Sequence, residues 1–247
     1  MRDLPRVVQV RRSGGGVERR EDMISLTIDD HRVEAIEGSS ILEVAREHGI
    51  EIPTLCYHEA LEPYGSCRLC VVEVETPRGA RLVASCVYPA EEGAVVKTDS
   101  EMVQKSRRMT AELLLAAAPH AKAIQGLAAA MGVSEPRVSL SDNDCILCGL
   151  CVRACKEIVG AMALSLVNRG FSKEVSPPFE TGSNACVGCT TCVFICPTGA
   201  IKLKDVLGNR SVHRWESDFD VRACKLCGDH FLAAEVSIDL EKALTEE

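Results

Sequence analysis

Hydrophobic residues alternate with polar ones in the first part of the chain, as they do in half-buried strands. The alternation over residues 24–28 and again over 33–35, with Asp29-Asp30 between the two runs, predicts a hairpin. Three further strands are predicted over residues 71–75, 81–86 and 95–96. A turn at 76–79 joins the first two of these three strands.

Helical spacing replaces this alternation in two places. Ser40 and Glu43 have the spacing of a capping box, which predicts a short helix over Ile41–His48 among the strands. Two Ala-rich helices follow the strands, the first with Asp99 as its predicted N-cap and the second over Ala121–Met131. Neither of these two helices contains a cysteine.

Composition and charge limit the classes of function. A chain of 247 residues with 4% aromatic residues suits two or three small domains better than one large core. The net charge of −8 argues against non-specific nucleic-acid binding, which depends on Lys and Arg. No apolar run has the length of a membrane-spanning helix, and no apolar region follows Arg11-Arg12 or Arg19-Arg20 as an export signal requires. The sequence therefore predicts a cytoplasmic protein with no membrane span and no nucleic-acid partner.

Twelve of the 14 cysteines fall into three ordered sets of four. In the first set ten, two and fifteen residues separate the members, and the other two sets are both C-x2-C-x2-C-x3-C. The sets are Cys56, Cys67, Cys70 and Cys86; Cys145, Cys148, Cys151 and Cys155; and Cys186, Cys189, Cys192 and Cys196. Disulfide frameworks belong to short secreted domains and do not repeat in this way, so the sets predict iron–sulfur clusters.

The order of the first set, one cysteine, a pair and a distant fourth, predicts a [2Fe–2S] cluster, whose irons each take two thiolates. Gly65 would let the backbone pass close to the inorganic sulfur. Zinc is the alternative, but it favours two C-x2-4-C pairs and this set has one. The other two sets predict two cubane [4Fe–4S] clusters. Because the fourth cysteine of each such run ligates the other cluster, the assignment is Cys145, Cys148, Cys151 and Cys196 to one cubane and Cys186, Cys189, Cys192 and Cys155 to the other.

A last C-x2-C pair, Cys224 and Cys227, lies near the C-terminus. With His213 and His230 it would supply the four ligands of a zinc site. The pair also fits a redox-active dithiol, or two cysteines without a function, and these interpretations stay open. A final amphipathic helix is predicted over about residues 233–244.

Together these patterns predict an α+β fold. A β-grasp [2Fe–2S] ferredoxin domain leads through a short helical segment to a two-cluster [4Fe–4S] ferredoxin-like domain, and a small C-terminal tail carries the C-x2-C knuckle. The predicted boundaries are 1–22 for a disordered basic tail, 23–98 for the first domain, 99–135 for the helical segment, 136–207 for the second domain and 208–247 for the tail.

These motifs resemble the N-terminal iron–sulfur region of the large iron–sulfur subunit of bacterial NADH dehydrogenase (complex I). They are equally similar to the diaphorase iron–sulfur subunits of NAD-linked hydrogenases, to NAD-linked formate dehydrogenases and to the front of iron-only hydrogenases. The resemblance covers about residues 23–207, and three phrases carry it: Ile52-Pro53-Thr54-Leu55-Cys56, Gly65-Ser66-Cys67-Arg68-Leu69-Cys70 and Cys151-Val152-Arg153-Ala154-Cys155.

The chain departs from these relatives at one cluster. They commonly hold a further cubane through H-x3-C-x2-C-x5-C, just after an Arg-Arg-Met helix. Here Arg107-Arg108-Met109 leads to His120, but Ile124, Leu127 and Gly132-Val133 stand where the cysteines would be. We therefore expect residues 99–133 to pack as a plain helical core and to be the only bridge between the [2Fe–2S] domain and the cubane pair. The [2Fe–2S] cluster would then exchange electrons with a flavin partner directly or form a side branch.

The sequence contains no paired general acid and base, activated nucleophile or phosphate-binding loop, which predicts a non-catalytic chain. The resemblance implies that this chain is an electron-transfer subunit of a cytoplasmic NAD(P)-linked oxidoreductase. The resemblance implies a flavin- and NAD(P)-binding subunit on one side and a separate catalytic subunit on the other. That subunit would be a hydrogenase, formate dehydrogenase, acyl-CoA reductase or bifurcating enzyme, and ferredoxin is a further candidate partner. The alternatives are a free multi-cluster ferredoxin and an iron–sulfur redox sensor, although no DNA-binding output module is visible.

Overall fold

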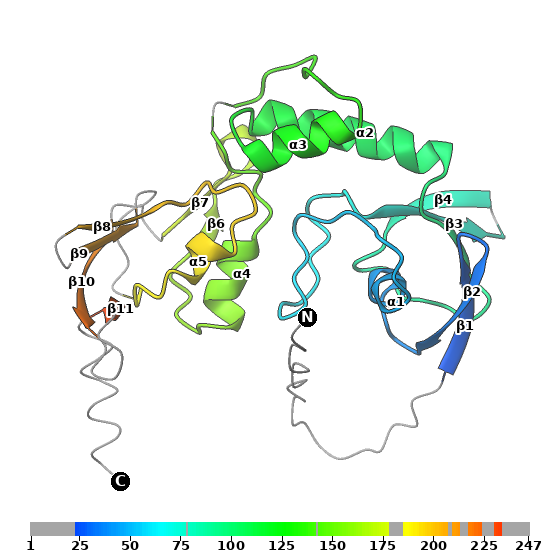
Figure 1. The fold of residues 1–247 in the computed structure, drawn as a ribbon, viewed down its shortest axis with the longest axis horizontal. Helices are drawn as coiled ribbons and strands as arrows, with labels where there is room; N and C mark the ends of the chain where they lie inside the picture. Colours follow the sequence, from blue (N-terminus) through cyan, green and yellow to red (C-terminus); the bar gives the residue numbers. More distant parts are fainter. Residues whose placement is uncertain are drawn as a thin grey trace, which may run out of the picture.

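The computed structural model describes residues 23–77, 79–141, 143–177 and 185–202, and beyond them the backbones of four strands. The predicted tail 1–22 lies outside the described residues, as do Cys224, Cys227 and His213. Figure 1 shows the first sheet on one side, the segments that carry the cubane cysteines on the other, and two helices running above both. None of the described helices is long and apolar enough to cross a membrane.

The first unit is a mixed five-stranded sheet with the order β2-β1-β5-β3-β4. Its strands are β1 (Met23–Ile28), β2 (His31–Ile36), β3 (Val71–Thr76), β4 (Gly79–Ala84) and β5 (Val95–Lys97). Strand β1 pairs parallel with β5, and all other pairs are antiparallel. The predicted hairpin of β1 and β2 is confirmed, and its turn residues Asp29 and Asp30 both have positive φ, 47° and 65°, as a two-residue hairpin turn requires.

Helix α1 (Ile41–Glu47) packs against this sheet. Its capping box is confirmed: the Glu43 N–H donates to Ser40 Oγ at 3.3 Å, and the Ser40 N–H donates to Glu43 Oε2 at 2.8 Å. The apolar face of α1 is fully buried in one core with the inward-facing residues of the strands. This core holds the sheet and helix together beneath the loops that carry the first cysteine set.

Helices α2 (Glu101–Ala117) and α3 (Lys122–Ala130) lie against each other, as Figure 1 shows. The predicted N-cap of α2, Asp99, is wrong by one residue. Ser100 has the extended backbone of an N-cap, and its Oγ accepts from the Val103 N–H at 3.3 Å. Asp99 instead accepts a hydrogen bond from the Gln104 side chain at 3.1 Å.

The remaining elements surround the cubane cysteines. They are α4 (Leu150–Glu157), β6 (Ser165–Val167), the 3₁₀ turn η1 (Gly170–Ser172), β7 (Glu174–Ser176) and α5 (Thr191–Phe194). Helices α4 and α5 are in contact, and β6 and β7 form an antiparallel hairpin. This arrangement brings the two C-x2-C-x2-C loops, one before each helix, to neighbouring positions.

The chain continues into a four-stranded antiparallel sheet with the order β11-β10-β9-β8. Its strands are β8 (Leu203–Val206), β9 (Asn209–Val212), β10 (Ser217–Ala223) and β11 (His230–Ala233). Ile201 is buried beside the cubane cysteines, and β8 begins two residues later at Leu203. Of the predicted helix 233–244 only Ala233 is described, and it ends β11.

Candidate iron–sulfur centres

The first cysteine set gathers on the loops at one end of the first sheet. Cys56 and Cys67 lie on the long connection between α1 and β3, Cys70 directly precedes β3, and Cys86 follows β4. All four are buried, with Cys56 1% exposed and Cys67 7%. The Cys67 N–H donates to Cys56 Sγ at 3.3 Å. Four buried thiols on converging loops fit the donor set of a [2Fe–2S] cluster.

The backbone of this loop turns through the left-handed region twice. Gly65 has φ 66° and Arg68 has φ 57°. A Cβ on Gly65 would also lie 3.4 Å from Val87 Cγ2, so a larger residue there would be strained and crowded. Turns of this kind point successive N–H groups to one side, which makes a concave site for an anion such as an iron–sulfur cluster.

The four thiols form two hydrogen-bonded pairs. The Cys56 thiol donates to the Cys67 sulfur, which lowers the pKa of Cys67 to about 5 and raises that of Cys56. Cys86 donates in the same way to Cys70, lowering the pKa of Cys70 to about 6 and raising that of Cys86. Two adjacent sulfur pairs are what two irons with two thiolates each require.

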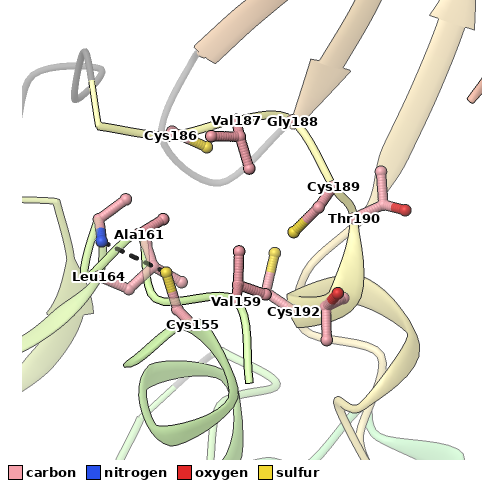
Figure 2. A pocket seen from close by; sticks show the side chains of 12 residues that line it. Cys155, Val159, Ala161, Leu164, Cys186, Val187, Gly188, Cys189, Thr190 and Cys192 are labelled. Atoms are coloured by element: carbon pink, nitrogen blue, oxygen red, sulfur yellow. Dashed lines mark hydrogen bonds between the residues drawn. The ribbon is translucent and has the colours of Figure 1, made fainter. Parts of the chain in front are cut away.

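The other eight cysteines line two separate pockets. Cys145, Cys148, Cys151 and Cys196 line one together with Ile146, Val175 and Ile201. Cys155, Cys186, Cys189 and Cys192 line the other, and Figure 2 shows the labelled sulfurs around a common space. The structure thus brings together both groups of four that the crossed assignment names.

The two cubane loops repeat one backbone pattern. The second residue after the first cysteine has positive φ in each, 53° at Leu147 and 62° at Gly188. The residue after the second cysteine does so too, with 74° at Gly149 and 61° at Thr190. A bulky residue in this conformation costs energy, so the repetition indicates that both loops are shaped for the same kind of bound group.

Burial controls the ionisation of the cubane thiols. It raises the pKa of Cys148 to about 11 and that of Cys151 and Cys192 to about 12. Burial opposes ionisation at Cys196 as well, but hydrogen bonds from Thr198 and nearby backbone N–H groups outweigh it and lower its pKa. Cys148, Cys151 and Cys192 therefore keep their protons at neutral pH until metal binds, and loading releases those protons.

No group of three or more described His, Cys, Asp or Glu side chains is arranged to hold a single metal ion. The cubane sets are compatible with this finding because a cluster distributes its four ligands over several irons. His230 is the first residue of β11, and its side chain is not described. With Cys224, Cys227 and His213 outside the described residues, the zinc site stays a prediction.

The loops of the first set touch the first cubane loop directly. Cys56, Cys67 and Cys148 belong to one apolar core, which they share with Leu61, Leu69, Leu150 and Ala154. Ser66 Oγ also donates to the Leu147 carbonyl at 3.3 Å. The expectation that residues 99–133 form the only bridge is therefore wrong. It failed because the loops that meet here are some eighty residues apart in sequence, as the separation of 81 between Ser66 and Leu147 shows.

The helical segment does pack as a plain core, as expected. Ile124 is fully buried and Val133 is 9% exposed, both in a core with Leu115, Ala118, Ala121 and Ala128. Leu127 is half-buried against the core that contains Cys56 and Cys148. His120 is exposed in the turn between α2 and α3. Apolar side chains fill the positions where the relatives' cysteine spacing would place ligands.

Arg107 contacts the backbone on both sides of Cys70, and the sequence patterns did not reveal this contact. It lies on the buried face of α2, where it donates from Nε to the Leu69 carbonyl at 3.2 Å and from Nη2 to the Val71 carbonyl at 2.8 Å. These carbonyls flank Cys70. A signal was available, because Arg107 falls in the four-residue spacing of the buried positions Val103 and Ala111.

Comparisons with known proteins agree with this description. The family model of a 2Fe-2S iron-sulfur cluster binding domain matches residues 21–101, and that of a 4Fe-4S binding domain matches residues 183–202. A subunit of the NADH-quinone oxidoreductase of Rhizobium meliloti (strain 1021) is 36% identical over 206 residues, which cover 72% of this chain and 24% of the relative. The HndD subunit of the NADP-reducing hydrogenase of Solidesulfovibrio fructosivorans is 39% identical over 211 residues, covering 72% of this chain and 36% of the relative.

The chain thus spans about a quarter of the first relative and just over a third of the second. A chain of similar extent occurs in the crystal structure of an NAD+-reducing [NiFe]-hydrogenase in the H2-reduced state. The two chains are 30% identical with a TM-score of 0.63, over 78% of this chain and 88% of the other. The resemblance found in the motifs is confirmed, and the chain belongs to the family of iron–sulfur proteins that includes these NADH-quinone oxidoreductase and NAD+-reducing hydrogenase chains.

Proposed function

We propose that the chain is a non-catalytic electron-transfer subunit of a cytoplasmic NAD(P)-linked oxidoreductase. It would hold one [2Fe–2S] cluster through Cys56, Cys67, Cys70 and Cys86, and two cubanes through the crossed sets of Cys145 to Cys196. Such clusters supply one-electron carriers when bound. The observation that carries the proposal is the gathering of twelve cysteines into three sites within one continuous body.

The order of the sites along the molecule supports a linear route. Cys56 and Cys67 of the first set share an apolar core with Cys148 of the first cubane set. The first and second cubane sets are joined by α4, which carries Cys151 of one set and Cys155 of the other. We therefore propose that electrons pass through the three sites in sequence. The sequence alone predicts instead either direct exchange of the [2Fe–2S] cluster with a flavin partner or a side branch, with the cubanes fed from elsewhere.

Partners follow from this role. A flavin- and NAD(P)-binding subunit would deliver or accept electrons at one end of the chain, and a catalytic subunit at the other. Ferredoxin is a further candidate partner.

We also propose domain boundaries at about residues 98, 135 and 207. They would separate the [2Fe–2S] domain, the helical segment, the cubane domain and the C-terminal tail. Zinc in that tail is a separate proposal that awaits metal analysis.

Anaerobic purification with iron and sulfide analysis tests the proposal. Two irons in the first site and four in each cubane predict about ten irons per chain. A content near six would show that one cubane site stays empty, and a content near two would show that both do. A content near fourteen would require a fourth cluster.

The route has a test of its own in the assembled complex. Cys56→Ala removes a ligand of the first site while leaving every cubane cysteine in place. A linear route predicts that NAD(P)H no longer reduces the cubanes in this variant. Full reduction of the cubanes at the wild-type rate would show instead that the first site is a side branch.

A further inference from the structure

Arg153 connects the two loop systems that meet in the centre of the molecule. It lies on α4 between Cys151 and Cys155, which belong to different cubane sets. Its Nη2 donates to the carbonyl of Cys56 at 2.6 Å, and its Nη1 donates to the carbonyl of Glu62 at 2.5 Å. One side chain therefore links the helix shared by both cubane sets to the backbone of a [2Fe–2S] ligand.

We propose that Arg153 is a positioning residue that fixes the first-site loop, residues 56–67, against the first cubane loop. The inference rests on the proposed function, since it concerns how the ligand sets are held relative to one another. It extends that function by naming the side chain that sets the relative position of the two sites. Both of these Arg153 hydrogen bonds reach backbone carbonyls, so its effect would act through the loop backbone.

The contacts around Arg153 all hold the same short stretch of loop. The Glu62 N–H donates to Glu157 Oε2 at 2.9 Å, one helical turn after Arg153 on α4. Residue 62 is thus held at both its N–H and its carbonyl by one face of the helix. The guanidinium also lies over the Tyr64 ring, 5.5 Å from its centroid, and a Cβ on Gly149 would be 3.7 Å from that ring.

An arginine suits this position better than a lysine. Its planar guanidinium presents several N–H donors in a fixed geometry and can stack on an aromatic ring, whereas an ammonium is a point charge. Here two terminal nitrogens donate to two different carbonyls, and Nε is buried without a partner among the described residues. The two loop carbonyls are therefore the acceptors that orient this group.

The test compares anaerobically purified, iron-loaded full chains carrying Arg153→Gln, Arg153→Lys and the control Lys156→Gln. Lys156 is exposed on the same helix, so its replacement removes the same charge without touching the loop. Amide hydrogen exchange over residues 56–67 reports opening of the loop. The magnetic interaction between the reduced [2Fe–2S] cluster and a reduced cubane, seen in EPR spectra, reports their relative position.

Loss of a charge-assisted hydrogen bond shifts such a local equilibrium by about tenfold or more. We therefore expect exchange over residues 56–67 to accelerate by about tenfold in Arg153→Gln, with a weaker magnetic interaction and unchanged values in Lys156→Gln. Arg153→Lys keeps the charge and loses the fixed two-carbonyl geometry. Removal of the positive charge in Arg153→Gln should lower the reduction potential of the [2Fe–2S] cluster. Arg153→Lys should restore this potential while the exchange remains fast.

Wild-type exchange and wild-type magnetic interaction in an iron-replete Arg153→Gln chain would overturn the inference and leave the proposed function intact. Should Arg153→Gln not load iron, Arg153→Lys decides, and wild-type behaviour of that variant in both measurements would overturn the positional role. A wild-type chain without [2Fe–2S] or cubane signals would instead contradict the proposed function itself.

Discussion

Replacing Arg107 tests how the helical segment supports the [2Fe–2S] site. Arg107 is 9% exposed, and burial lowers its pKa, which starts so far above neutrality that the side chain stays charged. Its two hydrogen bonds reach the backbone carbonyls of Leu69 and Val71. These two residues are 0% and 7% exposed. Because water cannot readily reach these carbonyls, Arg107→Gln leaves at least one of them without a donor.

The expected cost follows from those two bonds. A hydrogen bond to a charged donor contributes about 1.5–3 kcal/mol, and a buried acceptor left unpaired costs a comparable amount. Glutamine is shorter and can replace one bond at most, so the net loss should be about 2–4 kcal/mol. Removal of the positive charge also disfavours the more negative, reduced form of the nearby cluster, so the reduction potential of the [2Fe–2S] site should fall.

Cluster loss makes unfolding irreversible, so the assay is a rate: bleaching of the [2Fe–2S] visible absorption in urea under anaerobic conditions. If the lost interaction is absent from the transition state, a cost near 3 kcal/mol accelerates bleaching by roughly a hundredfold. Arg108→Gln is the matched control, because Arg108 is the adjacent residue and is exposed. Equal bleaching rates and equal potentials in the two variants would refute the role assigned to Arg107.

Three further outcomes are expected. Cys67→Ala should abolish the [2Fe–2S] EPR signal while both cubane signals persist, and simultaneous loss of all three would contradict separately formed sites. Ile124→Ala removes a fully buried side chain from the helical core and should destabilise the chain by about 3 kcal/mol. The bleaching assay should show this as a faster rate, with the iron content unchanged. If the C-terminal pair holds zinc, anaerobic protein should contain about one zinc per chain, which Cys224→Ala removes while the cluster spectra survive; zinc well below one equivalent would exclude this site.

Local features could be predicted from the sequence because each depends on residues close together in the chain. The Ser40 capping box and the Asp29-Asp30 hairpin turn are of this kind, and their geometry matches the expectations. The N-cap of α2 was misplaced because Asp99 and Ser100 are adjacent and both can cap. Only the backbone conformation decides between them.

Long-range contacts could not be predicted in the same way. The hydrogen bond from Arg153 to the Cys56 carbonyl joins residues 97 apart, and no periodicity marks such a pair. The C-terminal sheet was not predicted either, although alternation of apolar and charged residues over 219–222 was an available signal for β10. The Arg153 contact is set by tertiary packing, and the spacing of residues along the sequence does not reveal it.

The helical segment gains a structural role from these long-range contacts. Leu55 and Ile146, which adjoin Cys56 and Cys145, each pack against two cores: that of α2 and α3, and that shared by Cys56, Cys67 and Cys148. Through Leu55 and Ile146, the apolar residues of α3 therefore pack against one loop of the [2Fe–2S] site and one loop of the first cubane site. Since interiors are close-packed, a void at Ile124 would disturb both loops at once. A segment without cluster ligands can thus still hold together the two sites between which electrons are proposed to pass.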